Sequence, residues 1–202
     1  MSLFSDVYYE VERDAEFVLR ERGSKFYAYV YGVRSEAEVK EKLEVLKRAY
    51  PDATHHCYAW VMGARGEAQR ANDDGEPSNS AGRPILRSII SVGVTNVVVV
   101  VVRYFGGTLL GIPGLIESYG EAAESALRAA GRLEKFIEET YEISSAFEHE
   151  QEIHRLIAKY GARVLGSEYT EQVCYRVAVK AGVGRDFENA LFDHYQLSGK
   201  RM

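Results

Sequence analysis

The chain has 202 residues, of which 46% are hydrophobic and 27% charged, an ordinary globular composition and a length suited to one large or two small domains. Its formal net charge of −5 argues against a protein whose whole surface wraps nucleic acid, although a local basic patch is compatible with it. The two cysteines, Cys57 and Cys174, and the lack of an apolar leader in residues 1–16 favour a cytoplasmic protein with no membrane partner.

The N-terminal part of the chain predicts two strands, a helix and a further strand. Segments rich in tyrosine and valine at 6–12 and 25–33 predict the first two strands. A helix is predicted from Ser35 to Ala49, because Ser35 is a suitable N-cap and Glu38, three residues later, completes a capping box. Residues 55–62 predict the next strand.

A long polar loop follows, from Asn72 to Pro84. Loops of this length inside a compact chain are usually functional or disordered. Its carboxylates, hydroxyls and arginine either bind a ligand or satisfy one another through Asx turns and a helix cap. Both interpretations stay open from the sequence. The next helix is predicted at 84–92, because Pro84 suits a first turn and Gly93 ends a helix well.

Six consecutive valines, Val97 to Val102, predict a central strand covered on both faces, because a strand with one wet face would alternate polar and apolar residues. An arginine, two aromatics and a glycine pair follow at once, at 103–107. Function is often found where a rigid strand delivers side chains to a loop, although Gly106-Gly107 also suits a plain turn. A helix is predicted at 115–130.

The last third of the chain predicts a second, smaller domain. Strands at 139–147, 163–170, 173–180 and 197–202 and helices at 150–160 and 185–195 give the order βαββαβ, the ferredoxin-like unit. The boundary is predicted in the charged stretch 132–139, with domains at 1–135 and 136–202. Because the apolar parity of the strands should face the helices, the open face is expected to lack the aromatic side chains that RNA-recognition motifs use for stacking.

Known nucleotide, metal and hydrolase motifs are poorly matched. Residues 106–111 have neither the Gly-x-Gly-x-x-Gly spacing nor a Walker lysine. His55 and Cys57 share one strand face, but no further pair of ligands with zinc spacing is present, so we expect no metal and no cofactor. A histidine with Ser78 and Asp74 has the residue types of a hydrolase without a Gly-x-Ser-x-Gly elbow, and enzymatic activity stays an open alternative.

Several blocks of sequence, in the same order, resemble the signature of the Impact/YigZ family. They are Gly23-Ser24-Lys25-Phe26, the stretch from His55 to Ala59, Asp73-Asp74-Gly75-Glu76-Pro77-Ser78, Ala81-Gly82-Arg83-Pro84-Ile85-Leu86, Thr95-Asn96, Arg103-Tyr104-Phe105-Gly106-Gly107 and Leu110-Gly111. The resemblance covers roughly residues 20–130. On these blocks the chain is identified as a member of the bacterial two-domain form of that family.

The resemblance implies an α+β fold with two domains. The N-terminal domain is expected to resemble ribosomal protein S5 domain 2, and the ferredoxin-like C-terminal domain a late domain of elongation factor G. Eukaryotic relatives regulate the kinase that slows translation initiation during amino-acid starvation. This chain departs from the family pattern at Asn79-Ser80, where the family has Gly-Thr, and at Glu117, where an arginine is usual. The second departure puts a phosphate-binding role at that position in doubt.

Three cations, Lys25, Arg83 and Arg103, are predicted to converge beside the glycine pair, where guanidinium and backbone N–H donors would suit a phosphate or an acidic partner. Alternatively, the two arginines pair with loop carboxylates and only hold the loop in place. The candidate binding residues are Lys25, Asp73, Asp74, Gly75, Glu76, Ser78, Arg83, Arg103, Tyr104, Gly106 and Gly107.

We therefore predict a non-enzymatic binding protein associated with translation or its regulation. It would contact RNA, the ribosome or a translation-regulating protein through a cleft built from residues 73–84 and 103–111. This function rests on the folds that the domains resemble, and a fold does not fix a function. The competing hypothesis is a small-molecule or phosphate-ester enzyme that uses the same cleft. An enclosed pocket would favour the enzyme, and an open basic groove would favour the binding protein.

Overall fold

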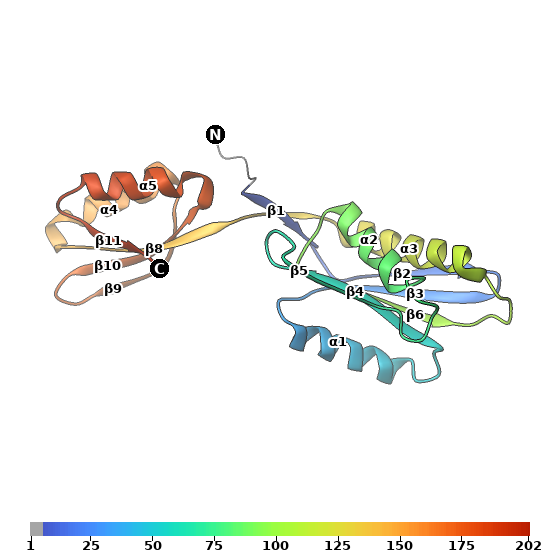
Figure 1. Cartoon of the computed structure of the whole chain (residues 1–202). Helices are drawn as coiled ribbons and strands as arrows, with labels where there is room; N and C mark the ends of the chain where they lie inside the picture. The colour runs from blue at the N-terminus through green and yellow to red at the C-terminus, as the bar shows by residue number, and fades with distance from the viewer. Residues whose placement is uncertain (1–5) are drawn as a thin grey trace. The chain divides into compact units, whose positions relative to one another are not determined.

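The computed structural model describes residues 6–202, an α+β chain that divides into two compact units (Figure 1). One unit comprises residues 8–135, and the other comprises residues 136–202 together with Asp6 and Val7. The apolar clusters that form the cores each lie within one unit. Within the described residues, none of the helices combines the length and the apolar character that a bilayer crossing needs.

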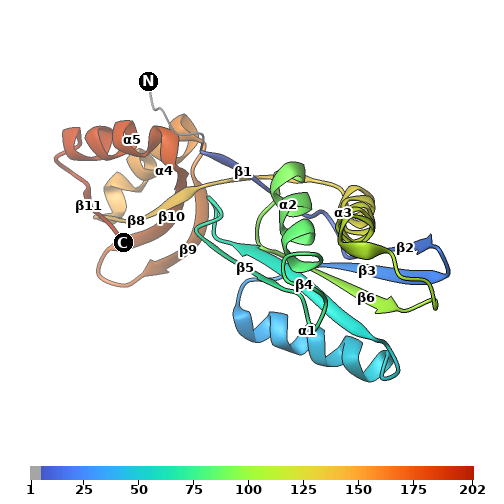
Figure 2. The same ribbon diagram turned by 45° about the vertical axis from the view of Figure 1, so that its right-hand side comes forward.

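A five-stranded antiparallel sheet forms the middle layer of the first unit. In spatial order its strands are β2 (Ala15–Glu21), β3 (Ser24–Gly32), β6 (Val97–Tyr104), β4 (His55–Met62) and β5 (Ala68–Asn72). Helices α2 (Gly82–Val92) and α3 (Gly111–Ala130) cover one face, and α1 (Glu36–Ala49) covers the other (Figure 2). The valine strand is β6, and its predicted central place is confirmed.

The valines of β6 fill a core on each side of the sheet. Val97, Val99 and Val101 pack against α2 and α3, and the valines between them pack on the α1 side. Side chains of a strand alternate between its faces, so an unbroken apolar run needs two cores. At the end of the strand the same alternation sends Arg103 to the α2–α3 face and Tyr104 to the α1 face.

The helix ends follow the predicted caps. Ser35 Oγ accepts the N–H of Glu38 at 3.3 Å, and the Glu38 carboxylate accepts the N–H of Arg34 at 2.9 Å. Helix α2 ends at Gly93, whose φ of 74° lies in the left-handed region that glycine adopts without strain. Helix α3 begins at Gly111, ahead of the predicted start at 115.

Three strands lie where the sequence predicts none. Strands β2 and β5 form the edges of the sheet. The exposed charged residues Glu16 and Arg20 of β2 interrupt the apolar pattern that would predict a strand. The third, β7 (Leu133–Phe136), pairs with β1 (Val7–Glu10). The stretch predicted as a charged connection is therefore partly a strand, because its backbone finds a partner far away in the sequence.

The second unit has the predicted order βαββαβ. Its elements are β8 (Glu138–Ser145), the short 3₁₀ turn η1 (Phe147–His149), α4 (Glu150–Tyr160), β9 (Arg163–Tyr169), β10 (Val173–Lys180), α5 (Ala181–Asp193) and β11 (Ser198–Arg201). The strands pair antiparallel in the order β11-β8-β10-β9. Tyr141, Ile143, Val177 and Phe187 are buried in its core.

The sheet of the second unit keeps its aromatics on the helix side. Val173, Tyr175, Val177 and Val179 of β10 all belong to the buried core. The opposite parity pairs Cys174 with Ser144 and Arg176 with Glu142 across β8. The prediction that this open parity of β8 and β10 lacks aromatic side chains is confirmed.

Candidate functional site

The polar loop after β5 caps helix α2. Asp73 Oδ1 accepts the N–H groups of Ala81 at 3.1 Å and Gly82 at 2.8 Å, while its Oδ2 accepts the N–H of Asn79 at 2.8 Å. These are donors at the start of the helix that would otherwise lack partners. Both carboxylate oxygens of Asp73, a predicted binding residue, therefore accept hydrogen bonds from the loop backbone and the start of α2.

Asp74 fastens the loop to strand β4. Its Oδ2 accepts the N–H of His56 at 2.6 Å, and its backbone oxygen lies 2.7 Å from His55 Nδ1. A carbonyl oxygen can only accept, so Nδ1 of His55 carries a proton. Nε2 of His55 then faces the carboxylate of Glu76, with 3.8 Å between Nε2 and Oε1.

A buried ion pair lies beneath the loop. Oε1 of Glu76 accepts from Arg103 Nη1 at 2.5 Å and from the Tyr119 hydroxyl at 2.8 Å. The two charged side chains are only 4% and 6% exposed. An ion pair at this depth requires each charge to have its partner, because either one alone in the core is very costly. The alternative in which the two arginines pair with loop carboxylates therefore holds for Arg103, with Glu76 as its partner, but not for Arg83.

Neither potential nucleophile near the pair is activated. The thiol of Cys57 lies 3.0 Å from the Asp73 carbonyl oxygen and 3.4 Å from the Tyr119 hydroxyl. Burial raises the pKa of Cys57, and burial also raises the pKa of Tyr119. Both groups therefore keep their protons at neutral pH, which disfavours attack by a thiolate or phenolate.

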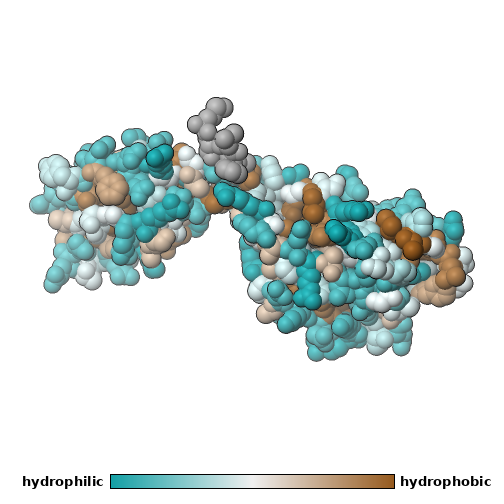
Figure 3. All heavy atoms as spheres, viewed as in Figure 1, coloured by the Kyte–Doolittle hydropathy of each residue, from teal (hydrophilic) through white to brown (hydrophobic). Residues whose placement is uncertain are grey.

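An open pocket of about 410 Å³ lies over the ion pair. It is lined by Thr54, His55, Glu76, Pro77, Arg103, Phe105, Leu109, Leu110, Gly111, Ile112 and Leu115. At its mouth Leu109, Ile112 and Phe105 are 83%, 54% and 46% exposed. Apolar surface is visible at this end of the unit (Figure 3). The pocket thus has a neutralised polar floor and an apolar mouth.

The three predicted cations do not converge. Lys25 precedes Phe26, which packs on the α2–α3 side, so the strand alternation places Lys25 on the α1 side with its cross-strand partner Tyr104. Arg83 is exposed on α2, and among the described residues it has no ion-pair partner. Arg103 alone lies in the pocket. The expectation of a basic phosphate site is therefore not met.

The remaining predicted residues shape the loops. Gly106 packs directly against Gly23, so a Cβ on Gly106 would lie 2.0 Å from the Gly23 carbonyl carbon. The N–H of Gly106 donates to Ser24 Oγ at 3.2 Å. Gly75 adopts a φ of 87° beside His55, Gly107 a φ of 84°, and Ser78 lies exposed on the loop.

Phe105 and Leu109 lie within the predicted cleft segment 103–111, although they were not among the candidate binding residues. Ile112 and Tyr119, both in helix α3, lie outside the predicted cleft and were missed. An isolated leucine after a glycine turn resembles an ordinary loop residue, and only its high exposure marks it as unusual. Among the described residues, no group of three or more histidine, cysteine or acidic side chains is arranged to hold a metal ion.

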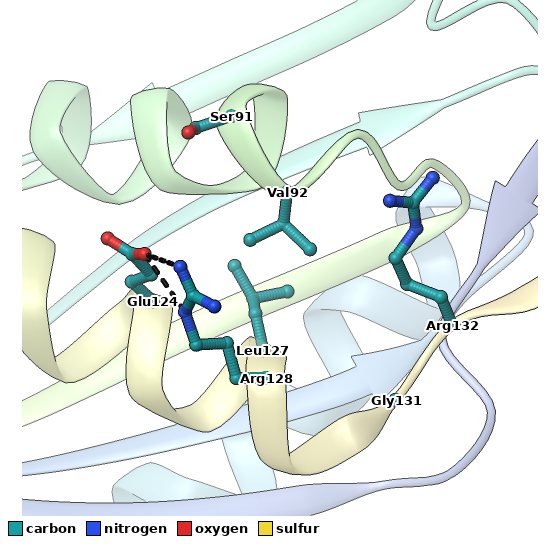
Figure 4. Close-up of a pocket in the computed structure, with 7 residues that line it drawn as sticks. All are labelled: Ser91, Val92, Glu124, Leu127, Arg128, Gly131 and Arg132. Carbon is teal, nitrogen blue, oxygen red and sulfur yellow. Dashed lines mark hydrogen bonds and ion pairs between the residues drawn. The ribbon is translucent and has the colours of Figure 1, made fainter.

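A second hollow, of about 490 Å³, lies between the C-terminal ends of α2 and α3 (Figure 4). Val92 and Leu127 point toward each other across its floor, with Arg128 and Arg132 on its sides. Arg128 is bonded to Glu124 through Nε at 3.0 Å and Nη2 at 2.6 Å, and the Arg132 guanidinium lies 4.0 Å from the Tyr9 ring centroid. The first pocket is the stronger candidate, because exposed apolar side chains line its mouth.

The same region carries the family signature. Residues 22–127 match the model of the Impact N-terminal domain, which covers the pocket, its loops and the helices above them. The chain belongs to the Impact family. Impact family member YigZ of Escherichia coli K12 is 34% identical over 88% of this chain and 87% of that protein. Impact family member YvyE of Bacillus subtilis 168 is 37% identical over 63% of this chain and 59% of that protein.

A solved structure supports the fold of the whole chain. The crystal structure of a hypothetical protein is 29% identical in sequence and covers 98% of both chains with a TM-score of 0.71. The two chains therefore share one arrangement of elements along nearly their full length.

Proposed function

We propose that this protein is a non-enzymatic binding protein associated with translation or its regulation, and that its pocket holds an apolar segment of a translation-regulating protein. The link to translation comes from its family. We further propose that residues 8–135 adopt an S5 domain 2-like fold, that residues 136–202 adopt a ferredoxin-like fold similar to a late domain of elongation factor G, and that the protein is cytoplasmic.

The chemistry of the pocket carries the choice of a protein partner. Glu76 already neutralises Arg103, and among the described residues no second lysine or arginine lines the pocket. A phosphate backbone would therefore find little net positive charge there. Exposed Leu109, Ile112 and Phe105 instead offer apolar area of the kind that anchors a partner's side chain.

Leu109→Glu tests this proposal because it places a charge at the mouth without touching the ion pair. A tagged protein should lose its bound regulator, identified by mass spectrometry, while the exposed Leu133→Glu control should retain it. Cosedimentation with ribosomes at low and high salt provides the second arm. Salt-sensitive ribosome binding that survives Leu109→Glu would contradict a protein partner in the pocket.

The enzyme alternative is favoured by one observation, the convergence of His55, Glu76 and Tyr119 beneath an open pocket. A histidine and a carboxylate close together are the residue types of general acid–base catalysis. Turnover of a small phosphorylated or ester substrate that Glu76→Gln abolishes, in protein that remains folded, would establish this alternative and replace the binding function.

A further inference from the structure

The α1 side of the five-stranded sheet carries a row of tyrosines. Tyr27, Tyr29 and Tyr31 alternate along β3 on this side, and all three are half-buried. Helix α1 packs over β4 and β6 and reaches the tyrosines of β3 only along one edge, through Lys42 over the Tyr31 ring and through Tyr50 at its C-cap. We call Tyr27, Tyr29, Tyr31, Tyr50 and Tyr104 the tyrosine face.

The rings of the tyrosine face are ordered relative to one another. The rings of Tyr29 and Tyr31 are nearly parallel, with 4° between their planes and 6.3 Å between their centroids. Tyr27 stacks on Tyr50, with 5.6 Å between centroids, and Tyr104 contacts Tyr27 edge-on. The hydroxyls of Tyr29 and Tyr50 share a hydrogen bond. These contacts hold the partly exposed rings in fixed orientations.

Two unpaired cations lie at one end of the tyrosine face. Arg20 on β2 and Lys25 on β3 are cross-strand partners, and both are exposed. Among the described residues, neither side chain has an ion-pair or hydrogen-bond partner. Asp14 and Glu16 lie toward the other end, where together with burial they raise the pKa of Tyr31. Lys42 of α1 lies over the Tyr31 ring, 4.8 Å from its centroid, and Asp52 acts on Tyr104. Cations and acids thus both border the tyrosine face, and Arg20 and Lys25 are the exposed cations beside Tyr27.

We propose that the tyrosine face binds a short single strand of nucleic acid. Ordered aromatic rings on an open sheet accept stacked bases without regard to sequence, and neighbouring cations contact the phosphates. In the second unit the open parity of β8 and β10 lacks aromatic side chains, whereas the tyrosine face offers both rings and exposed cations. The proposal is independent of the pocket and its partner.

Stacking is tested by fluorescence anisotropy with labelled oligo(U) and oligo(dT) of about ten nucleotides, a length within the range that single-strand-binding folds cover. Tyr31→Leu and Tyr27→Leu should each weaken binding at least about fivefold, because each removes a stacking ring. The phenylalanine variants at the same positions keep the ring and should bind like wild type. Tyr195→Leu, at a tyrosine 90% exposed in the other unit, is the matched control.

The cations are tested by the salt dependence of the same measurement. The Arg20→Ala and Lys25→Ala variants should each flatten the plot of log affinity against log salt by about 0.7, one phosphate contact on a single strand. Arg87→Ala, which removes an exposed arginine on α2, should leave the slope unchanged. Binding of oligo(U) without binding of oligo(dT) would assign the face to RNA. Equal binding of both would assign it to single-stranded nucleic acid in general.

Three results would overturn the proposal. The first is an absence of salt-sensitive binding to either oligonucleotide by the full chain. The second is binding that the leucine variants leave unchanged while circular dichroism shows them folded. The third is a concentration-dependent dimer in sedimentation velocity that Tyr31→Leu dissociates, since this would assign the tyrosine face to a second copy of the chain.

Discussion

A single buried carboxylate organises the candidate site at the scale of residues. Glu76 meets Arg103, Tyr119 and His55 from three different elements. Asp73 and Asp74, just before it in the loop, fasten the loop to the start of α2 and to strand β4. The ion pair at the floor is therefore part of the fold as well as part of the pocket. Substitutions at Glu76 or Arg103 are therefore expected to alter both the stability of the fold and binding in the pocket.

Breaking the Glu76–Arg103 pair should be strongly destabilising. Glu76→Gln and Arg103→Met should each lower the free energy of unfolding by about 3–5 kcal/mol, because each leaves one buried charge unpaired. The double variant should lose much less than the sum. Urea denaturation of wild type, the two single variants and the double variant measures the coupling free energy. The cycle pairs Arg103 with Glu76 rather than with Asp74, because the Asp74 carboxylate bonds to the backbone of β4.

An exposed pair provides the control for this cycle. Arg128 and Glu124, one helical turn apart with side chains 73% and 42% exposed, should couple by less than about 1 kcal/mol. If the Glu76 and Arg103 variants lost as little free energy of unfolding as the control variants, and if their losses were additive, the buried pair would not hold the loop.

His56 should make stability depend on pH. Burial lowers the pKa of His56 below its ordinary value of 6.5, although the carboxylate of Asp74 opposes this shift. The unfolded chain therefore binds the proton first, and the free energy of unfolding should fall as pH decreases through about 6.5 and level off below the native pKa. His56→Gln should flatten this dependence, whereas His149→Gln should not. Identical profiles for wild type and His56→Gln would contradict the assignment.

At the scale of elements, the contact between the β2–β3 turn and the end of β6 positions the pocket. Gly106 lies against Gly23, and Ser24 Oγ accepts hydrogen bonds from Gly106 and from Arg103 Nη2 at 3.4 Å. The close approach of two backbones requires that neither carries a side chain. Packing thus requires a glycine at position 106, the first of the glycine pair.

Two neighbouring alanine substitutions separate these roles. In Gly106→Ala the new Cβ would lie 2.0 Å from backbone, so strands β3 and β6 must separate at this end. Gly107→Ala meets no atom within 4 Å and should cost only about 1–2 kcal/mol for its left-handed backbone. Thermal denaturation should show the larger loss for Gly106→Ala. Equal losses would mean that the backbone contact is not required.

At the scale of the whole molecule, the chain divides into two compact units whose apolar cores are separate. One is the sheet of residues 15–104 with its three helices, and the other is the four-stranded sheet of residues 138–201. Strand β7 lies between the two sheets in sequence and pairs with β1, near the N-terminus. The N–H of Ile137 donates to the Asp6 carbonyl at 2.8 Å. Each core has the buried apolar residues that an independent folding unit needs.

A fragment of residues 1–137 should remain folded, because it retains the first core and the pairing of β1 with β7. Amide exchange should show protected β3, β4 and β6, and circular dichroism should show a cooperative thermal transition. A shorter fragment that ends at residue 131 loses β7 and should be less stable. Loss of all protected amides in the 1–137 fragment would contradict two independent folding units.

The sequence alone determined the elements whose pattern is local. The valine run predicts its own central strand, Ser35 and Glu38 predict the start of α1, and Gly93 predicts the end of α2. Each of these signals lies within a few residues of the structure it causes. The family blocks lie on the same segments, so the sequence also predicted the Impact family.

Tertiary structure decided everything that depends on distant partners. The edge strands become strands only through pairing, and Glu76 meets Arg103 across 27 positions of sequence. Strand alternation separates Lys25 and Tyr104 from Arg103, although all were predicted at one site. Burial free energy depends on which face a helix covers, and no local pattern specifies that choice. The apolar mouth and the tyrosine face therefore emerged only from the folded chain.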